Sequence, residues 1–209
     1  MKIAHLISSA LLTLAASLPM AANAGAPIVI NPTSDGSIYT CAGCNPVADG
    51  EYVVTEGYVQ GVEKFSTAAI TLPVLKATLT LNPYGLPLWS PTVDIYGYGT
   101  TDGQLVASDG NAGTFLGTLT LPVNLGFGQD AFFDVTEFVS HTYASSPFLA
   151  FNLRGSSGAG NVFSSLEYNY GHPSQLLITA VPEPGEYALM LAGLAMVGAI
   201  ARRRRQRSA

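Results

Sequence analysis

The C-terminal segment, residues 181–209, places the strongest limit on how this chain can fold. Its apolar run, residues 187–201, is followed at once by a cluster of basic residues: Arg202, Arg203, Arg204, Arg205 and Arg207. An apolar run that ends in basic charge is typical of a segment that enters a membrane and keeps its arginines on the cytoplasmic side. The globular part of the chain must therefore precede residue 181.

The apolar run is short for a membrane span. Its 15 residues would form a helix about 22 Å long, against about 30 Å of hydrocarbon in a bilayer. Local thinning of the bilayer, or arginines that reach for its surface, can accommodate such a helix. We predict a single transmembrane helix over residues 187–201 within a tail of residues 181–209.

The N-terminus has the features of a signal peptide. Met1 and Lys2 precede a mostly apolar stretch over residues 3–18, and Ala22-Asn23-Ala24 has the small-x-small pattern that signal peptidase accepts. We predict cleavage after Ala24, so that residues 1–24 direct export across the inner membrane. An uncleaved N-terminal anchor is the alternative.

Residues 25–180 remain as one domain of 156 residues, long enough to bury a core. Its three basic residues, Lys64, Lys76 and Arg154, stand against twelve acidic ones. A net charge of −9 repels nucleic acid, so we expect no nucleic-acid partner.

Short β-rich runs separated by turn residues fill this domain, and no helical periodicity stands out. In residues 75–81, for example, Leu75, Ala77, Leu79 and Leu81 alternate with polar residues. The expected strands cover residues 51–59, 61–65, 75–81, 93–98, 115–121, 130–135, 148–153, 161–165 and 175–180. We predict an all-β fold, a β-sandwich or jelly roll of about nine strands, with one helical turn near residues 135–140.

Cys41 and Cys44 are the only two cysteines. Export permits a disulfide, and we expect one that closes a small loop. A redox-active pair would need a thioredoxin-like βαβ setting, which the sequence does not show. Zinc would need two more thiolate or imidazole ligands, and the domain offers only His141 and His172.

Pro182, Glu183 and Pro184 come just before the apolar run. Both prolines lack an amide donor and favour extended geometry in the residue before them, so we predict an exposed linker beside the membrane. The Pro-Glu-Pro motif, the apolar run and the arginine cluster together resemble a PEP-CTERM sorting signal. The resemblance implies recognition by an exosortase, a membrane-embedded cysteine protease-like enzyme, in a Gram-negative bacterium that makes exopolysaccharide.

The domain itself resembles a DNRLRE-type domain more loosely. The similar segments are Lys64-Phe65 with the strand at residues 75–81, then residues 133–136, 148–154, 163–167 and 175–178. The resemblance implies a jelly roll related to carbohydrate-binding modules. The arginine-rich strand of that family reads Ser164-Ser165-Leu166-Glu167 here, a departure that affects any binding role.

No catalytic motif is present in the sequence: it has no nucleophile elbow, metalloprotease helix or phosphate-binding loop. We therefore expect no enzyme, no catalytic residue and no cofactor. A polysaccharide lyase or hydrolase that uses His141 or His172 is the alternative. A structural calcium held by Asp94, Asp102 and Asp109 is also left open.

Exposed aromatic rings are what a sugar-binding surface needs. Trp89, Tyr96 and Tyr98 are the candidates, and Tyr96 and Tyr98 share a strand face opposite Val93 and Ile95. Rings that cover the sheet or belong to the core are the other interpretation. The sequence thus predicts an exported structural or adhesive protein of the cell surface or extracellular matrix that contacts exopolysaccharide.

Overall fold

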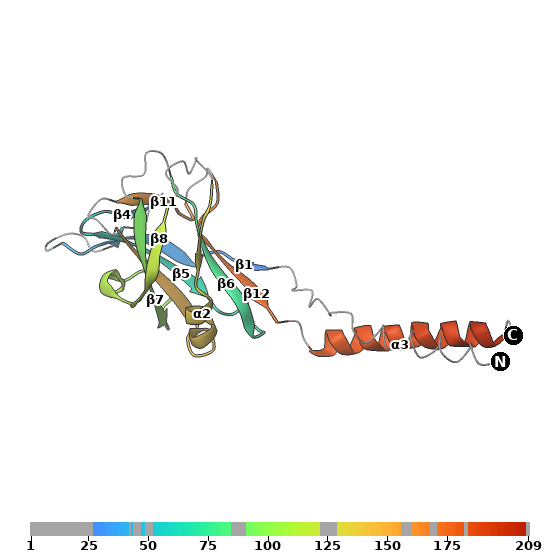
Figure 1. The fold of residues 1–209 in the computed structure, drawn as a ribbon. Helices are drawn as coiled ribbons and strands as arrows, with labels where there is room; N and C mark the ends of the chain where they lie inside the picture. The colour runs from blue at the N-terminus through green and yellow to red at the C-terminus, as the bar shows by residue number, and fades with distance from the viewer. Residues whose placement is uncertain are drawn as a thin grey trace.

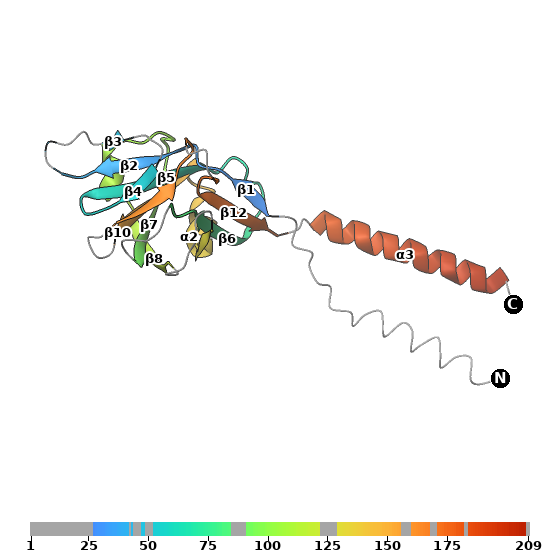
Figure 2. The same ribbon diagram turned by 90° about the horizontal axis from the view of Figure 1, so that it is seen from above.

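A computed structural model describes residues 27–41, 43, 47–48, 52–84, 91–121, 129–155, 160–167, 171–181 and 184–207. The predicted signal peptide and its cleavage site at Ala22 and Ala24 lie outside these residues. A β-sheet body is followed by a long helix that projects away from it (Figures 1 and 2).

The described residues form twelve strands. They are β1 (Ile28–Ile30), β2 (Ser34–Tyr39), β3 (Val47–Ala48), β4 (Tyr52–Thr55), β5 (Val59–Ser66), β6 (Val74–Leu81), β7 (Thr92–Thr100), β8 (Thr114–Thr120), β9 (Ala131–Asp134), β10 (Phe148–Gly155), β11 (Asn161–Ser164) and β12 (Gln175–Ala180). Three helical segments accompany them: η1 (Ala107–Asn111), α2 (Thr136–Thr142) and α3 (Pro184–Arg207).

The strands pair as in a jelly roll. Sheet I has the order β1-β12-β6-β9, and sheet II has the order β3-β2-β5-β10-β7-β8. Eight strands pair from the outside inwards along the chain, β1 with β12, β5 with β10, β6 with β9 and β7 with β8, all antiparallel. This nested pairing of two Greek keys defines the fold and confirms the predicted all-β sandwich. A ribbon of β4 and β11 is added as a third sheet.

The hydrophobic core lies between sheets I and II. Phe151 is at its centre, in edge contact with Phe65 at 5.8 Å and with Phe138 of α2 at 5.5 Å between ring centroids. Leu79 and Ile178 from sheet I belong to the same buried cluster. Burial of this apolar surface is the main force that holds the two sheets together.

Strands β1, β2 and β3 are not predicted by the sequence pattern. In β2, Asp35 and Ser37 occupy buried positions where an apolar residue would be expected. Tertiary hydrogen bonds make this arrangement stable: the Leu166 amide donates to Asp35 Oδ2 (2.9 Å) and the Val54 amide to Ser37 Oγ (2.9 Å). A strand covered on both faces by other segments need not alternate between apolar and polar residues.

Two predicted strands need correction. Residues 51–59 do not form one strand, because the chain turns between Glu56 and Val59, whose backbones exchange two hydrogen bonds, and Gly57 there has φ +54°. Leu75 does not face the core but is exposed, because the pairing of β6 with β12 shifts register at this point.

Helix α2 confirms the helical turn predicted near residues 135–140. Helix α3 is longer than the predicted 187–201, since it begins at Pro184 and continues to Arg207. Proline is well tolerated in the first helical turn and arginine is a good helix former, so the linker ends earlier and the helix later than expected. Among the described residues, no helix combines the length and the apolar character that crossing a membrane requires.

Candidate functional site

Strand β7 presents its two tyrosines on the outer face of sheet II. Val93 and Ile95 are fully buried on the inner face. Tyr96 pairs across the ladder with Asn152, and Tyr98 with Ala150, so both rings point away from the core. The predicted shared face is therefore present, but the two tyrosines have different surroundings.

Tyr98 is taken up by a buried polar network. Its hydroxyl donates to Asp109 Oδ1 at 2.7 Å, and Lys64 Nζ lies 2.8 Å from Asp109 Oδ2. Burial, the hydrogen bond to Asp109 and the negative charge of Asp109 all raise the pKa of Tyr98. Helix η1 covers this part of the sheet, and Asn152 donates to its Asp109 and Gly110 carbonyls. Tyr98 therefore holds the loop that carries η1 against sheet II, and its ring is not available to a ligand.

Tyr96 lies beside an exposed aromatic ring. The Phe115 side chain is 56% exposed and meets Tyr96 edge to face, with 5.4 Å between ring centroids. The guanidinium of Arg154 lies 3.7 Å from the centre of the Tyr96 ring, a cation–π contact. The chain thus displays two adjoining aromatic rings on a sheet surface.

Backbone and side-chain contacts fix the groups around these rings. Arg154 donates to Asn152 Oδ1 (3.2 Å) and to the Ala112 carbonyl (3.0 Å). The Thr118 hydroxyl donates to Asp94 Oδ1 at 2.6 Å. We call Tyr96, Phe115, Arg154, Asp94 and Thr118 the aromatic face.

A β-bulge creates this surface. Ile95 pairs with Gly117, but the next residue, Tyr96, pairs with Phe115, so Leu116 is the extra residue of β8. The bulge turns Phe115 outwards and leaves Leu116 directed at α2. The sequence pattern does not single out Phe115 or Arg154, because regular alternation from the buried Leu119 would point Phe115 at the core.

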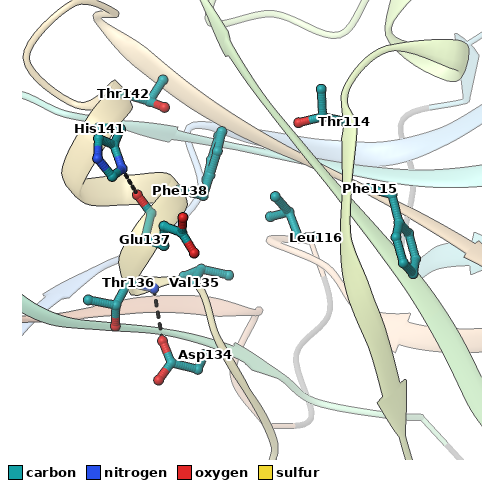
Figure 3. Close-up of a pocket in the computed structure, with 10 residues that line it drawn as sticks. All are labelled: Thr114, Phe115, Leu116, Asp134, Val135, Thr136, Glu137, Phe138, His141 and Thr142. Carbon is teal, nitrogen blue, oxygen red and sulfur yellow. Dashed lines mark hydrogen bonds between the residues drawn. The ribbon is translucent and has the colours of Figure 1, made fainter.

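An open cavity of about 760 Å³ separates α2 from β8. Figure 3 shows Phe138 and Leu116 beside it, with His141, Glu137 and Asp134 along α2 and its approach. His141 Nδ1 lies 2.7 Å from the Glu137 carbonyl within the helix, and Asp134 Oδ1 accepts the Thr136 amide at 2.9 Å. Hydrogen bonding to the Thr136 side chain and to the Thr136 amide lowers the pKa of Asp134.

The second predicted histidine lies elsewhere. His172 Nε2 is 3.2 Å from Asp130 Oδ1, which also accepts a hydrogen bond from Asn82. His172 is not among the residues that line the cavity of His141. The structure thus does not bring both imidazoles into that cavity.

The three acidic residues considered for calcium occupy different positions. Asp94 belongs to the aromatic face, Asp102 accepts the Gln104 amide in a loop, and Asp109 is paired with Lys64. Within the described ranges, no group of three or more histidine, cysteine or acidic side chains is arranged to hold a metal ion.

Several predicted residues fall outside the described ones, namely Trp89, Cys44, Pro182 and Glu183. Cys41 is described and is disulfide-bonded.

Helix α3 has several apolar side chains exposed to solvent. The exposed residues are Met190, Leu191, Leu194, Met196, Val197 and Ile200. A soluble globular protein rarely exposes a large apolar surface without a use for it. The family described as the PEP-CTERM protein-sorting motif matches residues 180–205. The tail is a PEP-CTERM sorting signal. No curated protein matches the chain.

The sorting signal identifies the chain as an exported protein of the kind that an exosortase processes. The match covers the tail and not the sandwich, so the resemblance of the domain to DNRLRE-type domains stays a prediction.

Proposed function

We propose that the sandwich is a non-catalytic component of the cell envelope or extracellular matrix, where it contacts exopolysaccharide. The PEP-CTERM tail supports delivery to that place, because it marks the chain for export and sorting. The signal peptide, the passage through the inner membrane and the final cell-surface location belong to this proposal.

The aromatic face is the observation that carries the binding part of the proposal. Sugar rings stack their apolar CH faces on aromatic side chains, and Phe115 offers an exposed ring beside Tyr96. Asp94 and Thr118 lie on the same outer face and supply hydrogen-bonding groups. Because the sheet is rigid and the rings are held by neighbours, little conformational entropy is lost on binding.

Retention on the exopolysaccharide of the native organism tests this proposal. The full chain, solubilised in detergent, should bind immobilised polysaccharide, and Tyr96→Ala or Phe115→Ala should weaken binding about threefold to tenfold, which corresponds to the stacking energy of one ring. Phe132→Ala is the matched control, since Phe132 is 59% exposed but belongs to sheet I. If the wild type is not retained, the proposed binding to exopolysaccharide is wrong and a structural role is left.

A polysaccharide-degrading enzyme is the competing proposal, and the cavity beside α2 is the observation that favours it. The cavity places His141 with Glu137 and Asp134, which could act as acids or bases. Release of reducing or unsaturated sugar ends by the purified chain, abolished by His141→Ala, would support this alternative against the non-catalytic one.

A further inference from the structure

Two carboxyl side chains lie next to each other inside the sandwich. Asp35 of β2 and Glu63 of β5 are directly opposite partners in the antiparallel ladder of sheet II, so both side chains leave the sheet on the same side. This is the inner side, because Phe151, the partner of Glu63 on β10, belongs to the core. Asp35 is 1% exposed and Glu63 is 0% exposed.

Glu63 is buried without a hydrogen bond or an ion pair from the described residues. Neither Glu63 Oε1 nor Oε2 accepts a hydrogen bond from a described residue. The ion pairs in the described part of the chain are Lys64 with Asp109 and His172 with Asp130, so none involves Glu63. A buried, unpaired carboxylate costs several kcal/mol relative to water.

The pKa of Glu63 reflects this environment. Burial raises the pKa of Glu63 to about 8, the nearby Ser174 hydroxyl opposes this increase, and the charge of Asp35 adds to it. A neighbouring positive charge would reverse the balance and keep both carboxyl groups ionised.

Two buried hydroxyl groups belong to segments that contact these carboxyl groups. Ser174 is completely buried just before β12, and its Oγ has no hydrogen-bond partner among the described residues. It is close enough to Glu63 to affect the pKa of that residue. Ser165 is also completely buried, and its Oγ has no partner in the described part of the chain. The next residue, Leu166, donates its amide to Asp35 at 2.9 Å. Unsatisfied buried hydroxyl groups are rare in native structures and call for a partner.

We infer that Asp35 and Glu63 form a buried site for one divalent cation, with the Ser165 and Ser174 hydroxyls as neutral ligands. Two carboxylates balance a divalent charge, and a set made only of oxygen atoms favours a hard cation. Calcium is the best match, because it accepts irregular oxygen ligands, whereas magnesium demands near-octahedral geometry and keeps its waters. Such an ion would join β2 and β5 of sheet II to the segments around β11 and β12.

This site differs from a carboxylate cluster on the surface. Its two acidic residues lie between the sheets, away from Asp94, Asp102 and Asp109. It contains two acidic side chains and no histidine or cysteine, so it is smaller than the groups of three or more such side chains that are absent from the described residues. The remaining ligands are neutral oxygen atoms.

Calcium binding to the full-length protein in detergent tests the inference. After EDTA treatment and dialysis into calcium, the wild type should retain about one calcium ion per chain by elemental analysis. At a calcium concentration near 100 times Kd its melting temperature should rise by about 5–10 °C. Glu63→Gln should lose the bound ion and the rise, while Glu56→Gln, which changes an exposed carboxylate on the neighbouring turn, should behave as the wild type does.

The EDTA condition separates a cation site from ordinary packing. Without metal, Glu63→Gln should melt no lower than the wild type, because it keeps the shape of the side chain and removes a buried ionisable group. If Glu63→Gln does not fold, Ser174→Ala serves instead and should raise the Kd for calcium about tenfold.

Three results would overturn the inference: no bound calcium in the wild type, a calcium response that survives in Glu63→Gln, or an unchanged Kd in Ser174→Ala. An equal rise in melting temperature with magnesium or sodium would overturn the choice of calcium.

Discussion

Lys64 shows how a charged side chain can be buried on the outside of a sheet. Its Nζ donates to the Gln104 carbonyl at 2.6 Å and to the Asp102 carbonyl at 3.3 Å, and it pairs with Asp109. One ammonium group thus neutralises a buried carboxylate and fastens the loop that carries η1 over sheet II. Its burial is tolerated because each of its donors has an acceptor.

We predict that Lys64→Met will destabilise the fold by about 3–5 kcal/mol, because it leaves the Asp109 carboxylate buried without a counter-charge. Urea denaturation of the purified chain measures the loss. Lys76→Met, at an exposed lysine of β6, should change the free energy of unfolding by less than about 0.5 kcal/mol. Equal stability of Lys64→Met and wild type would contradict a structural role for the pair.

Asp134 is expected to make stability depend on acid pH. Its carboxylate interacts with the Thr136 side chain and accepts the Thr136 amide at the start of α2, and these two interactions lower its pKa in the folded state. The stabilisation is therefore present above the unfolded pKa of about 3.9 and is lost as the pH falls through the lower folded pKa.

Asp134→Ala should accordingly cost about 1 kcal/mol at pH 7, by analogy with other lost helix-start acceptors. The difference from wild type should shrink below about pH 4, measured by urea denaturation at several pH values. Asp134→Asn keeps an acceptor, so it should retain most of the stability with a flatter pH dependence. A difference that is the same at pH 3 and pH 7 would disprove the role of the charge.

At the level of elements, the ribbon of β4 and β11 closes one part of the sandwich. Val53 and Phe163 pair across the ribbon, and both side chains are buried in the core. Gly61 on β5 lies beneath the ribbon, where a larger residue would collide with Val53. The same ribbon leads to Ser165, so its position also sets the proposed cation site.

The close approach of Gly160 to β4 gives a test of this packing. A Cβ at residue 160 would meet the backbone carbonyl of Thr55 and lie 2.5 Å from the Glu56 Cβ, so Gly160→Ala should destabilise the sandwich by about 1–3 kcal/mol. Thermal and urea unfolding measure this loss. Gly193→Ala is the control, because a Cβ there meets nothing within 4 Å; similar unfolding of both variants would argue against the tight contact.

At the scale of the whole molecule, both ends of the sandwich leave from one side. Ile28 of β1 pairs with Ile178 of β12, so the first and last described strands are neighbours. Figures 1 and 2 show α3 departing from the end where β1 begins. The sorting tail therefore departs from the sandwich beside the strand with which the described chain begins.

The Pro-Glu-Pro motif should decide whether the tail is removed. Intact-mass measurement of the protein from native cells should show loss of the tail from about residue 182, and a triple change of Pro182, Glu183 and Pro184 to alanine should leave it attached. Tyr96→Ala, which lies outside the signal, should be processed normally. A full-length mass for the wild type would refute processing at this motif.

Particular residues show how far sequence patterns reach. The sequence predicts that Leu79 and Leu81 lie in the core, because apolar and polar residues alternate regularly around them. The sorting tail is recognisable because its three parts are adjacent in the chain. Asp35 was not recognisable as a strand residue, since its hydrogen bond comes from Leu166, 131 residues away. Contacts of this separation leave no local pattern.

The sequence by itself determined the all-β class, the delivery signal and the shared face of Tyr96 and Tyr98, because each depends on residues close together in the chain. Only the tertiary structure decided which tyrosine stays available. Helix η1 and Asp109 occupy Tyr98, whereas the bulge at Leu116 places Phe115 beside Tyr96. It also brought Asp35 and Glu63 together, since strand pairing across the sheet, and not sequence spacing, sets which buried charges become neighbours.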